Sequence, residues 1–293
     1  MKNLQHFAIS DIINFQTNPH GLTKMVITND LAEAVIYLRG GNLTHFQPKG
    51  ESEVIFGGKT CEMHPEKTLH AGIPICWPWF GPHPTDSDKP QHGFARNKEW
   101  EVRETGQLAS GETRIVLGLH EDEETLELFA HMFDLTLTFT IGRQLRIDLR
   151  TYNSNAEPFH FTQALHSYFA ASDIDNLIIY GVEKTPFVDL ADDHKEKQED
   201  DLLMVDRTLN RVYGPSNQTC AILDKGSNRK IEIEKEGSRT TTIWNPGEES
   251  GLHDLPGDAY RKFVCIETCN AGQDIITLES GASHHITQKI SLA

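Results

Sequence analysis

Strict alternation of apolar and polar residues constrains the fold of this chain more than any other feature of its sequence. Residues 135–141 read LTLTFTI, and residues 145–149 repeat the pattern after the turn at Gly142-Arg143. Residues 115–119 and 286–292 alternate in the same way. Because successive side chains of a strand point to opposite faces, this period of two predicts strands with one buried face and one solvated face. The first two stretches are expected to form a hairpin.

Stretches of this kind recur from about residue 20 to the C-terminus, separated by clusters of Gly, Pro, Asn and Asp. Convincing helical periods are few, so the sequence predicts an all-β fold, a large antiparallel β-sandwich. No shift in composition marks a boundary and no repeat of fixed length occurs, so we expect a single domain spanning residues 1–293. The charged run from Asp189 to Asp200 is expected to be an exposed loop.

Charge and hydropathy exclude several classes of protein. The chain carries 43 acidic and 27 basic residues, a net charge of −16, whereas a surface for nucleic acid needs an excess of basic groups. No apolar run reaches the roughly 18 residues of a membrane-spanning helix. The N-terminal residues do not read as a signal peptide. We therefore expect a cytoplasmic protein that binds neither nucleic acid nor membranes.

Motif searches give no reason to expect a metal or a cofactor. The five cysteines include no C-x-x-C pair, which argues against a disulfide framework and against a structural zinc site. The adjacent pair His284-His285 would project to opposite faces of a strand and could not share one ion. The chain also lacks P-loop, G-x-G-x-x-G and G-x-S-x-G motifs, so nucleotide, dinucleotide and acyl-hydrolase functions have no support.

A segment rich in aromatic residues and proline is the first candidate for a binding site. Residues 69–83 read LHAGIPICWPWFGPH and residues 91–96 read QHGFAR, a mixture that Pro and Gly keep out of regular sheet. Aromatic faces beside hydrogen-bonding groups suit a sugar ring, which has an apolar face and a polar rim. The alternative is that Trp77, Trp79 and Phe80 are buried plugs beneath a long loop, and for each aromatic residue alone this interpretation is favoured.

Two further segments place ionisable side chains among apolar ones. If residues 163–169 are extended, His166 projects from a mostly apolar face, where a histidine is more often a hydrogen-bonded core residue than a catalyst. In residues 263–270, Glu267 lies among cysteines and aliphatic residues, and burying an unpaired carboxylate is costly. Such a carboxylate either pairs with a basic group or is tuned for proton transfer, and the two readings are about equally supported. Together the two residues form a possible acid/base couple with no nucleophile beside them.

Six short motifs occur in the order and spacing of a known family. GIPICWPWFG, QHGFAR, ALHSYF, NRVY, WNPG and FVCIET resemble those of the glucose-6-phosphate 1-epimerases, or hexose-6-phosphate mutarotases, in the aldose 1-epimerase superfamily. The resemblance extends from about residue 20 to the C-terminus. It implies a galactose mutarotase-like β-sandwich. It also implies cofactor-free interconversion of the α and β anomers of a hexose 6-phosphate, with glucose 6-phosphate as the expected substrate.

The resemblance also assigns roles to individual residues. His166 and Glu267 match the family's catalytic histidine and glutamate. His70 stands where the family usually has an arginine that contacts the substrate, so this departure affects the recognition of phosphate. Asn210 stands where the family usually has an aspartate that contacts the sugar. The expected substrate-binding residues are His70, Gln91, His92, Arg96 and Asn210.

Anomer exchange requires a base at the anomeric hydroxyl and an acid at the ring oxygen, so that the ring opens to the aldehyde and recloses on its other face. Glu267 is the expected base and His166 the expected acid, with His92 polarising the ring-oxygen side. Each such group typically contributes roughly 10²–10⁴-fold to the rate. The couple should begin as carboxylate and imidazolium, and the acidic charge of the protein should favour the protonated histidine.

Three alternatives compete with this function. The chain is either an aldose 1-epimerase that acts on unphosphorylated hexose, an alternative that His70 favours, or a catalytically silent carbohydrate-binding protein. The second alternative conflicts with the presence of both His166 and Glu267, since binding alone needs no acid/base couple. A metal-dependent enzyme of cupin type is the third. We expect a monomer whose partner is a small sugar or sugar phosphate.

Overall fold

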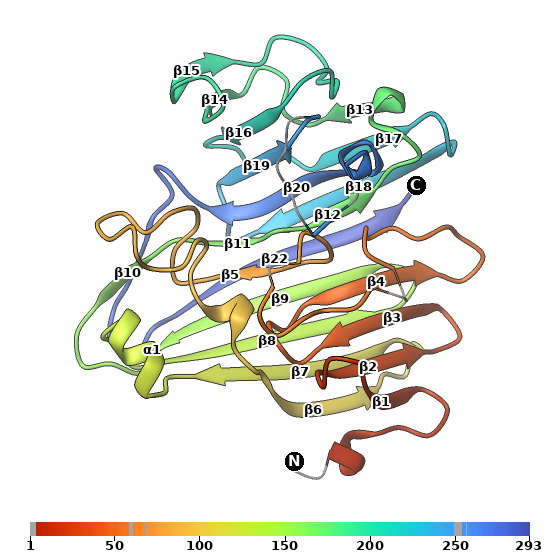
Figure 1. The fold of residues 1–293 in the computed structure, drawn as a ribbon, viewed down its shortest axis with the longest axis vertical. Coiled ribbons are helices and arrows are strands. Elements are labelled where there is room, and N and C mark those ends of the chain that lie inside the picture. Colours follow the sequence, from red (N-terminus) through yellow and green to blue (C-terminus); the bar gives the residue numbers. More distant parts are fainter. Residues whose placement is uncertain (1–3, 59–60, 68, 249–253, 256) are drawn as a thin grey trace.

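Two large antiparallel sheets dominate the computed structural model of the chain (Figure 1). The structure describes residues 4–58, 61–67, 69–248, 254–255 and 257–293. The first large sheet has the strand order β15-β14-β16-β19-β20-β11-β5, and β12 also pairs with β20. The second large sheet has the order β13-β17-β18-β22-β9-β8-β7-β6. A four-stranded sheet, β1-β2-β3-β4, and a small pair, β10-β21, complete the β structure described.

The strands of the first large sheet are short. They are β5 (Ile75–Cys76), β11 (Gln163–Leu165), β12 (Tyr168–Ala170), β14 (Pro186–Asp189), β15 (Lys195–Gln198), β16 (Leu209–Tyr213), β19 (Thr240–Asn245) and β20 (Phe263–Asn270). The strands of the second large sheet are mostly longer. They are β6 (Glu101–Gln107), β7 (Thr113–His120), β8 (Phe133–Ile141), β9 (Leu145–Asn153), β13 (Leu177–Tyr180), β17 (Cys220–Asp224), β18 (Arg229–Glu236) and β22 (Ser283–Leu292).

Helices contribute little to the described structure, and none of those described could cross a bilayer. The α-helix α1 begins after Asp122, whose side chain accepts from the Thr125 amide while the Thr125 hydroxyl accepts from the Asp122 amide. The remaining elements are η1 (Leu4–Phe7), α1 (Glu123–Leu128), η2 (Ala95–Asn97), η3 (Ile174–Asn176), η4 (Ala259–Lys262), β1 (Ile13–Thr17), β2 (Thr23–Thr28), β3 (Ala32–Tyr37), β4 (Leu43–Pro48), β10 (Phe159–Phe161) and β21 (Ile276–Leu278).

Alternation explains the second large sheet. Along β8 and β9, buried and half-buried positions alternate without exception, and Ile141 pairs with Leu145 across the turn. The hairpin predicted from the sequence is therefore confirmed. The inward side chains of both large sheets and of the four-stranded sheet form one continuous core, which is the arrangement of a β-sandwich.

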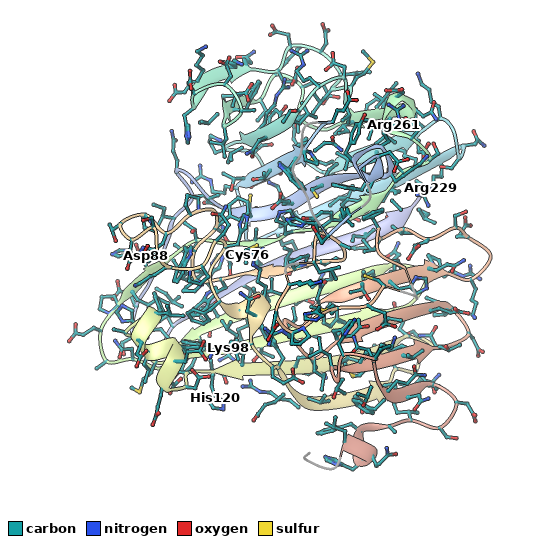
Figure 2. The ribbon with its side chains drawn as sticks, in the orientation of Figure 1. Cys76, Asp88, Lys98, His120, Arg229 and Arg261 are labelled. Carbon is teal, nitrogen blue, oxygen red and sulfur yellow. The ribbon has the colours of Figure 1, made fainter. Side chains whose placement is uncertain are left out.

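Polar contacts connect the layers. The Ser167 hydroxyl donates to Gln288 Oε1 on β22, and Gln288 Nε2 donates to the Ile266 carbonyl on β20. The guanidinium of Arg229 donates to the carbonyls of Glu53 and Ala170, which connects β12 and the segment after β4 to the first residue of β18 (Figure 2).

Two expectations about the strands are wrong. The first strand begins at Ile13 rather than near residue 20, because only Ile13 of β1 is buried and its pattern is therefore weak. Residues 189–200 do not form a mere loop, since β14 and β15 make a hairpin there. Its charges compensate one another, and Lys197 Nζ lies 2.7 Å from both Asp189 and Asp192. Mutual pairing of charges allows this polar sequence to form strands.

Candidate active site

Glu267 projects from the face of the first large sheet that points away from the main core. Along β20, Val264 and Ile266 join the main core, whereas Cys265 and Cys269 join separate small clusters on the opposite face. Glu267 lies between these two cysteines in the alternation. The division of faces predicted for residues 263–270 is confirmed.

His166 lies opposite Glu267 in the register that two short strands share against β20. β11 ends at Leu165 and β12 begins at Tyr168, and both strands pair with β20. Between them the His166 amide donates to the Pro74 carbonyl at 3.1 Å, and the imidazole stacks on Tyr168 with ring centroids 4.9 Å apart. His166 Nε2 lies 3.5 Å from Glu267 Oε1. The structure thus brings together the two residues expected to form the acid/base couple.

Burial shifts the pKa values of both residues of this couple. The side chains of Glu267 and His166 are 1% and 9% exposed, and Glu267 Oε2 and His166 Nδ1 have no hydrogen-bond partner in the described part of the chain. Burial raises the pKa of Glu267 well above its ordinary value. Burial, and then the charges of His92 and Arg96, lower the pKa of His166. Perturbed, buried and unsatisfied groups of this kind are typical of catalytic sites.

These shifts overturn one expectation about charge. The net charge of −16 does not favour a protonated His166, because burial and the basic groups His92 and Arg96 act locally in the opposite direction. Burial therefore disfavours charge on each of the two groups.

His92 approaches the couple as a neutral hydrogen-bond donor. Its Nδ1 accepts from the Gly81 amide at 3.1 Å, so the neutral ring carries its proton on Nε2. Burial, with smaller contributions from Arg96 and His70, lowers the pKa of His92 to about 3. The ring lies perpendicular to that of His166, with centroids 5.5 Å apart. His92 can therefore donate from Nε2 to a substrate oxygen beside His166.

The backbone next to His92 accounts for the His-Gly pair in the sequence. Gly93 has a φ of +72°, and a Cβ there would clash with the Trp77 carbonyl oxygen. The amide of Phe94 donates to the same carbonyl at 3.0 Å. Any side chain at position 93 would push the loop that carries His92 away from the site.

Arg96 brings positive charge to the same region. It lies on η2, its Nη2 donates to the Gln91 carbonyl at 2.7 Å, and its buried Nε has no partner among the residues described. Its charge lowers the pKa of both His92 and His166. A guanidinium with free donors suits an anionic group such as a phosphoryl group. The exposed Gln91 extends its amide to 3.5 Å from His92 Nε2.

His70 is engaged by a residue that sequence reasoning did not identify. The His70 amide donates to Asp254 Oδ2 at 2.8 Å, and His70 Nδ1 lies 2.7 Å from Asp254 Oδ1. One ring nitrogen is therefore committed, and Nε2 remains for a substrate. Asp254 follows the WNPG motif by seven positions, and no local pattern indicates that it contacts residue 70.

Asn210 lies on the same face as the couple but two strands away from β20. It pairs in register with Trp244, which in turn pairs with Cys265. Since directly paired residues of antiparallel strands point to one face, Asn210, Trp244 and Cys265 share the face of Glu267.

The aromatic residues divide between core and site. Trp77 is fully buried among Phe94 and Phe133, and Trp79 is buried with its Nε1 donating to the Pro90 carbonyl, so both are structural plugs. Three other rings face His166 instead. Their centroids lie 6.4 Å (Phe80), 5.9 Å (Trp244) and 4.9 Å (Tyr168) from that of His166. Trp244 was not identified as a candidate from the sequence, although its alternation with Thr242 on β19 could have shown its direction.

The described residues contain no cluster of three or more His, Cys, Asp or Glu side chains suited to a metal ion. His284 Nε2 instead lies 3.1 Å from Asn270 Oδ1.

Comparison with known proteins agrees with this geometry. A family model described as aldose 1-epimerase matches residues 23–291. An Escherichia coli K12 protein named "Putative glucose-6-phosphate 1-epimerase" is 32% identical over 277 residues, covering 93% of this chain and 91% of that protein. A Cenchrus ciliaris protein of the same name is 30% identical, covering 90% and 82%. The crystal structure of a "putative mutarotase" from Salmonella typhimurium has a TM-score of 0.89 at 28% identity, covering 98% and 95%.

The chain combines a two-sheet β-sandwich and a buried contact between a histidine and a glutamate with a family model that matches almost its whole length, and together these define the class. The chain belongs to the aldose 1-epimerase family. It is an isomerase that acts on a sugar, and the galactose mutarotase-like β-sandwich expected from its motifs is confirmed.

Proposed function

We propose that the chain interconverts the α and β anomers of a hexose 6-phosphate, with glucose 6-phosphate as the preferred substrate. The observation that carries the proposal is the buried contact of 3.5 Å between His166 Nε2 and Glu267 Oε1. The names of the relatives and the free donors of Arg96 support a phosphosugar in particular. Glu267 and His166 are the proposed catalytic residues, and the chemistry needs no cofactor.

Ring opening moves two protons and breaks one bond. Glu267 takes the proton of the anomeric hydroxyl, the bond between the anomeric carbon and the ring oxygen breaks, and His166 gives its proton to the departing ring oxygen. The products are the open aldehyde, a neutral Glu267 acid and a neutral His166 imidazole. Rotation about the first carbon–carbon bond and the same steps in reverse give the other anomer.

The pKa shifts fit this sequence of charge states. The charged couple acts on the closed ring, and the neutral couple accompanies the open aldehyde. Burial raises the pKa of Glu267 and lowers that of His166, so it stabilises the neutral couple. The site thus offsets part of the cost of opening the ring. Transfer of one proton from His166 Nε2 to Glu267 Oε1 converts the charged couple into the neutral couple.

The remaining site residues are proposed to position the substrate. His92 donates from Nε2 beside the ring oxygen, and Gln91 and Asn210 contact hydroxyl groups. Arg96 is the main anchor for the phosphoryl group, and His70 adds a donor through Nε2. We further propose that residues 1–293 form a single domain that acts as a monomer in the cytoplasm and binds neither nucleic acid nor membranes.

One observation supports a second class of substrate, the unphosphorylated hexoses. The ring of His70 is held by Asp254, which leaves one nitrogen for a ligand at a position where an arginine would offer several donors. Weaker phosphate recognition would make the chain an aldose 1-epimerase of unphosphorylated hexose.

Exchange NMR on glucose 6-phosphate and on glucose, with the same enzyme sample, separates these candidates. We expect a higher kcat/KM for glucose 6-phosphate. In Arg96→Ala, the KM for glucose 6-phosphate should rise by about tenfold or more, as for the loss of a charge-assisted contact, with little change for glucose. Equal weakening of both substrates would show that Arg96 contacts the ring and would leave phosphate specificity unsupported.

A further inference from the structure

Gln288 is a polar residue in an apolar row of the second large sheet. It lies on β22 between Ile286 and Ile290, and all three side chains share the core face and are fully buried. The two isoleucines belong to the continuous core. Burying an amide costs free energy unless its hydrogen bonds are made, so packing alone would favour an aliphatic residue here. The contacts of the amide therefore indicate its role.

The amide of Gln288 bonds to the neighbours of both residues of the couple. Its Oε1 accepts from the hydroxyl of Ser167, which directly follows the histidine, at 2.5 Å. Its Nε2 donates to the Ile266 carbonyl at 3.3 Å and to the Thr268 hydroxyl at 3.0 Å, and these two residues flank the glutamate. Because the Ile266 carbonyl can only accept, Nε2 must face it, which fixes the orientation of the amide.

A turn at His166 explains why β20 needs this partner. The Ser167 amide donates to the Leu165 carbonyl at 3.0 Å, which makes a three-residue turn centred on His166. In a regular antiparallel ladder the Ser167 amide would donate to the Ile266 carbonyl, in exchange for the bond of 3.2 Å from the Ile266 amide to the Ser167 carbonyl. The turn removes that donor, and Gln288 Nε2 takes its place.

The reacting groups lie on the opposite face of the strands that Gln288 contacts. Glu267 alternates with Ile266 and Thr268 along β20, so its carboxylate points away from Gln288. Gln288 therefore touches neither the substrate nor the reacting atoms. It connects the two backbone segments whose placement sets the contact of 3.5 Å between His166 Nε2 and Glu267 Oε1.

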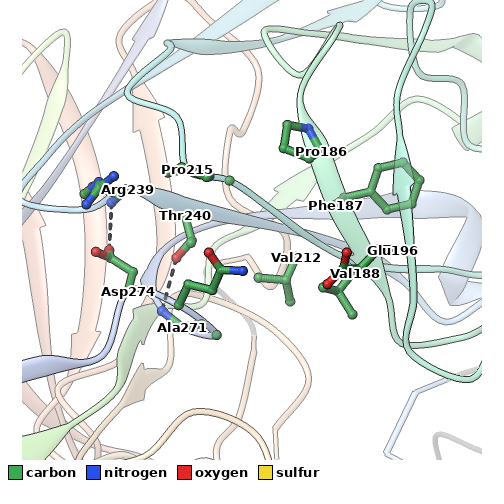
Figure 3. A pocket seen from close by; sticks show the side chains of 13 residues that line it. Pro186, Phe187, Val188, Glu196, Val212, Pro215, Arg239, Thr240, Ala271 and Asp274 are labelled. Atoms are coloured by element: carbon green, nitrogen blue, oxygen red, sulfur yellow. Dashed lines mark hydrogen bonds between the residues drawn. The ribbon is translucent and has the colours of Figure 1, made fainter.

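The turn after β20 holds that strand at its end (Figure 3). The Ala271 amide donates to Thr240 Oγ1 at 3.1 Å, and the Arg239 amide donates to Asp274 Oδ2 at 2.8 Å. Both bonds lie beyond the last residue of β20 and join the turn to the start of β19. They fix the end of the strand, whereas the amide of Gln288 acts at the level of the couple.

We propose that Gln288 is a positioning residue for anomer exchange. By bonding beside each member of the couple, it holds His166 and Glu267 at the separation at which both reach one sugar ring. Misplacement of reacting groups by about 1 Å can lower a rate by roughly a hundredfold, so a residue outside the site can control kcat. This inference rests on the proposed anomer exchange at His166 and Glu267.

Gln288→Leu tests this role, because leucine nearly keeps the volume of the side chain but can neither accept nor donate. The kcat for glucose 6-phosphate should fall by about tenfold to a hundredfold. The KM should stay within about twofold of wild type, since Gln288 does not touch the substrate. Exchange NMR measures both values, and urea unfolding gives the folded fraction by which kcat is corrected. An unchanged kcat per folded molecule would show a merely structural role and overturn the proposal.

Asn29→Leu is the matched control. The buried Asn29 also carries an amide that donates to a threonine hydroxyl and to a backbone carbonyl, those of Thr113 and Ile141, each at 2.9 Å. These contacts involve none of the strands that carry the couple. Asn29→Leu should therefore lower the free energy of unfolding but leave kcat within about twofold of wild type. A loss of kcat equal to that in Gln288→Leu would contradict a specific role for Gln288.

A milder variant covers the case in which Gln288→Leu does not fold. Ser167→Ala removes the bond on the side of the histidine and keeps both bonds on the side of the glutamate. Its kcat should fall by about threefold to tenfold, again with little change in KM. Wild-type kcat in Ser167→Ala would show that this bond does not position His166 and would contradict the proposal.

Wild type measured in the same series keeps the two proposals distinct. If wild type exchanges glucose 6-phosphate and the variants keep its kcat, the positioning role alone is contradicted. If wild type exchanges glucose but not glucose 6-phosphate, the phosphosugar function is contradicted, and the same loss of kcat measured on glucose supports the positioning role. A wild type that exchanges neither sugar contradicts both.

Discussion

The two large sheets are built from the same strand chemistry but treat their polar groups differently. On the second large sheet, outward charges pair with one another, as Arg146 does with Asp148 and Lys289 with Glu234. On the first large sheet, Glu267 and His166 are buried with atoms that have no partner among the described residues. Paired surface charges change stability little, whereas buried unsatisfied groups cost stability and supply reactivity. The comparison teaches that the two sheets share one core and that the first large sheet also carries the proposed chemistry.

Removing the carboxylate gives the largest expected effect. Glu267→Gln nearly keeps the shape of the side chain but cannot accept the anomeric proton, so kcat should fall by about two to four orders of magnitude. His166→Asn should act similarly by removing the acid. Exchange NMR on glucose 6-phosphate measures the loss, and circular dichroism checks that the fold is kept. Near wild-type exchange in Glu267→Gln would remove the proposed base.

A core substitution in the second large sheet should lower the free energy of unfolding without changing kcat. Leu149 on β9 is fully buried in the main core, so Leu149→Ala should lower the free energy of unfolding by about 2–5 kcal/mol. The kcat of the molecules that remain folded should not change. Asp148→Ala, one position away on the outer face, is the control, and its loss should be no more than about 1 kcal/mol. Similar losses at both positions, measured by urea unfolding, would contradict the assigned faces.

The pH dependence of the free energy of unfolding should show a smaller effect, but one that depends on Glu267 alone. The pKa of Glu267 is raised in the folded state above its ordinary value of 4.5, so its contribution to stability is complete below that pH and is lost as pH rises toward the folded-state pKa. Glu267→Gln should therefore match wild type near pH 4 and become more stable than wild type as pH increases. Each unit of pKa shift corresponds to about 1.4 kcal/mol.

The contribution of His166 to stability also changes with pH, but it changes alike in wild type and in Glu267→Gln. Its pKa is lowered from an ordinary value of 6.5, so its contribution is present above that value and is lost as pH falls through the folded-state pKa. Because both proteins keep His166, this loss largely cancels in the difference between them. Urea unfolding at several pH values measures the difference, and a constant difference from pH 4 to 8 would contradict a raised pKa for Glu267.

The sequence predicted most reliably the features that depend on neighbouring residues along the chain, such as the strands and their two faces. Alternation located β8, β9 and the two faces of β20, because the direction of a side chain depends only on its position along a strand. The motifs identified the family, and with it the pairing of His166 and Glu267. Geometry then separated Trp77 and Trp79, which plug the core, from Phe80, which faces His166.

What the sequence did not predict depends on contacts between distant segments. Asp254 lies 184 positions from His70, and only the fold brings them together. The charges of the β14–β15 hairpin compensate across strands, which no window along the chain reveals. The lowered pKa of His166 arises from burial and from the charges of His92 and Arg96, which lie about 70 positions earlier, whereas the net charge of the chain favours the opposite shift.

The common register of β11 and β12 against β20 makes the length of the segment between them as important as its composition. His166 faces Glu267 because both strands keep one register against β20, with Leu165 opposite Thr268 and Tyr168 opposite Cys265, and the Ser167 carbonyl still accepts from the Ile266 amide. Adding or removing one residue between Leu165 and Tyr168 would turn the imidazole toward the opposite face of the sheet. Under the proposed mechanism, such a change would abolish activity with both His166 and Glu267 still present. Homologues that have drifted to non-catalytic roles can therefore be sought by the spacing of this segment as well as by its residues.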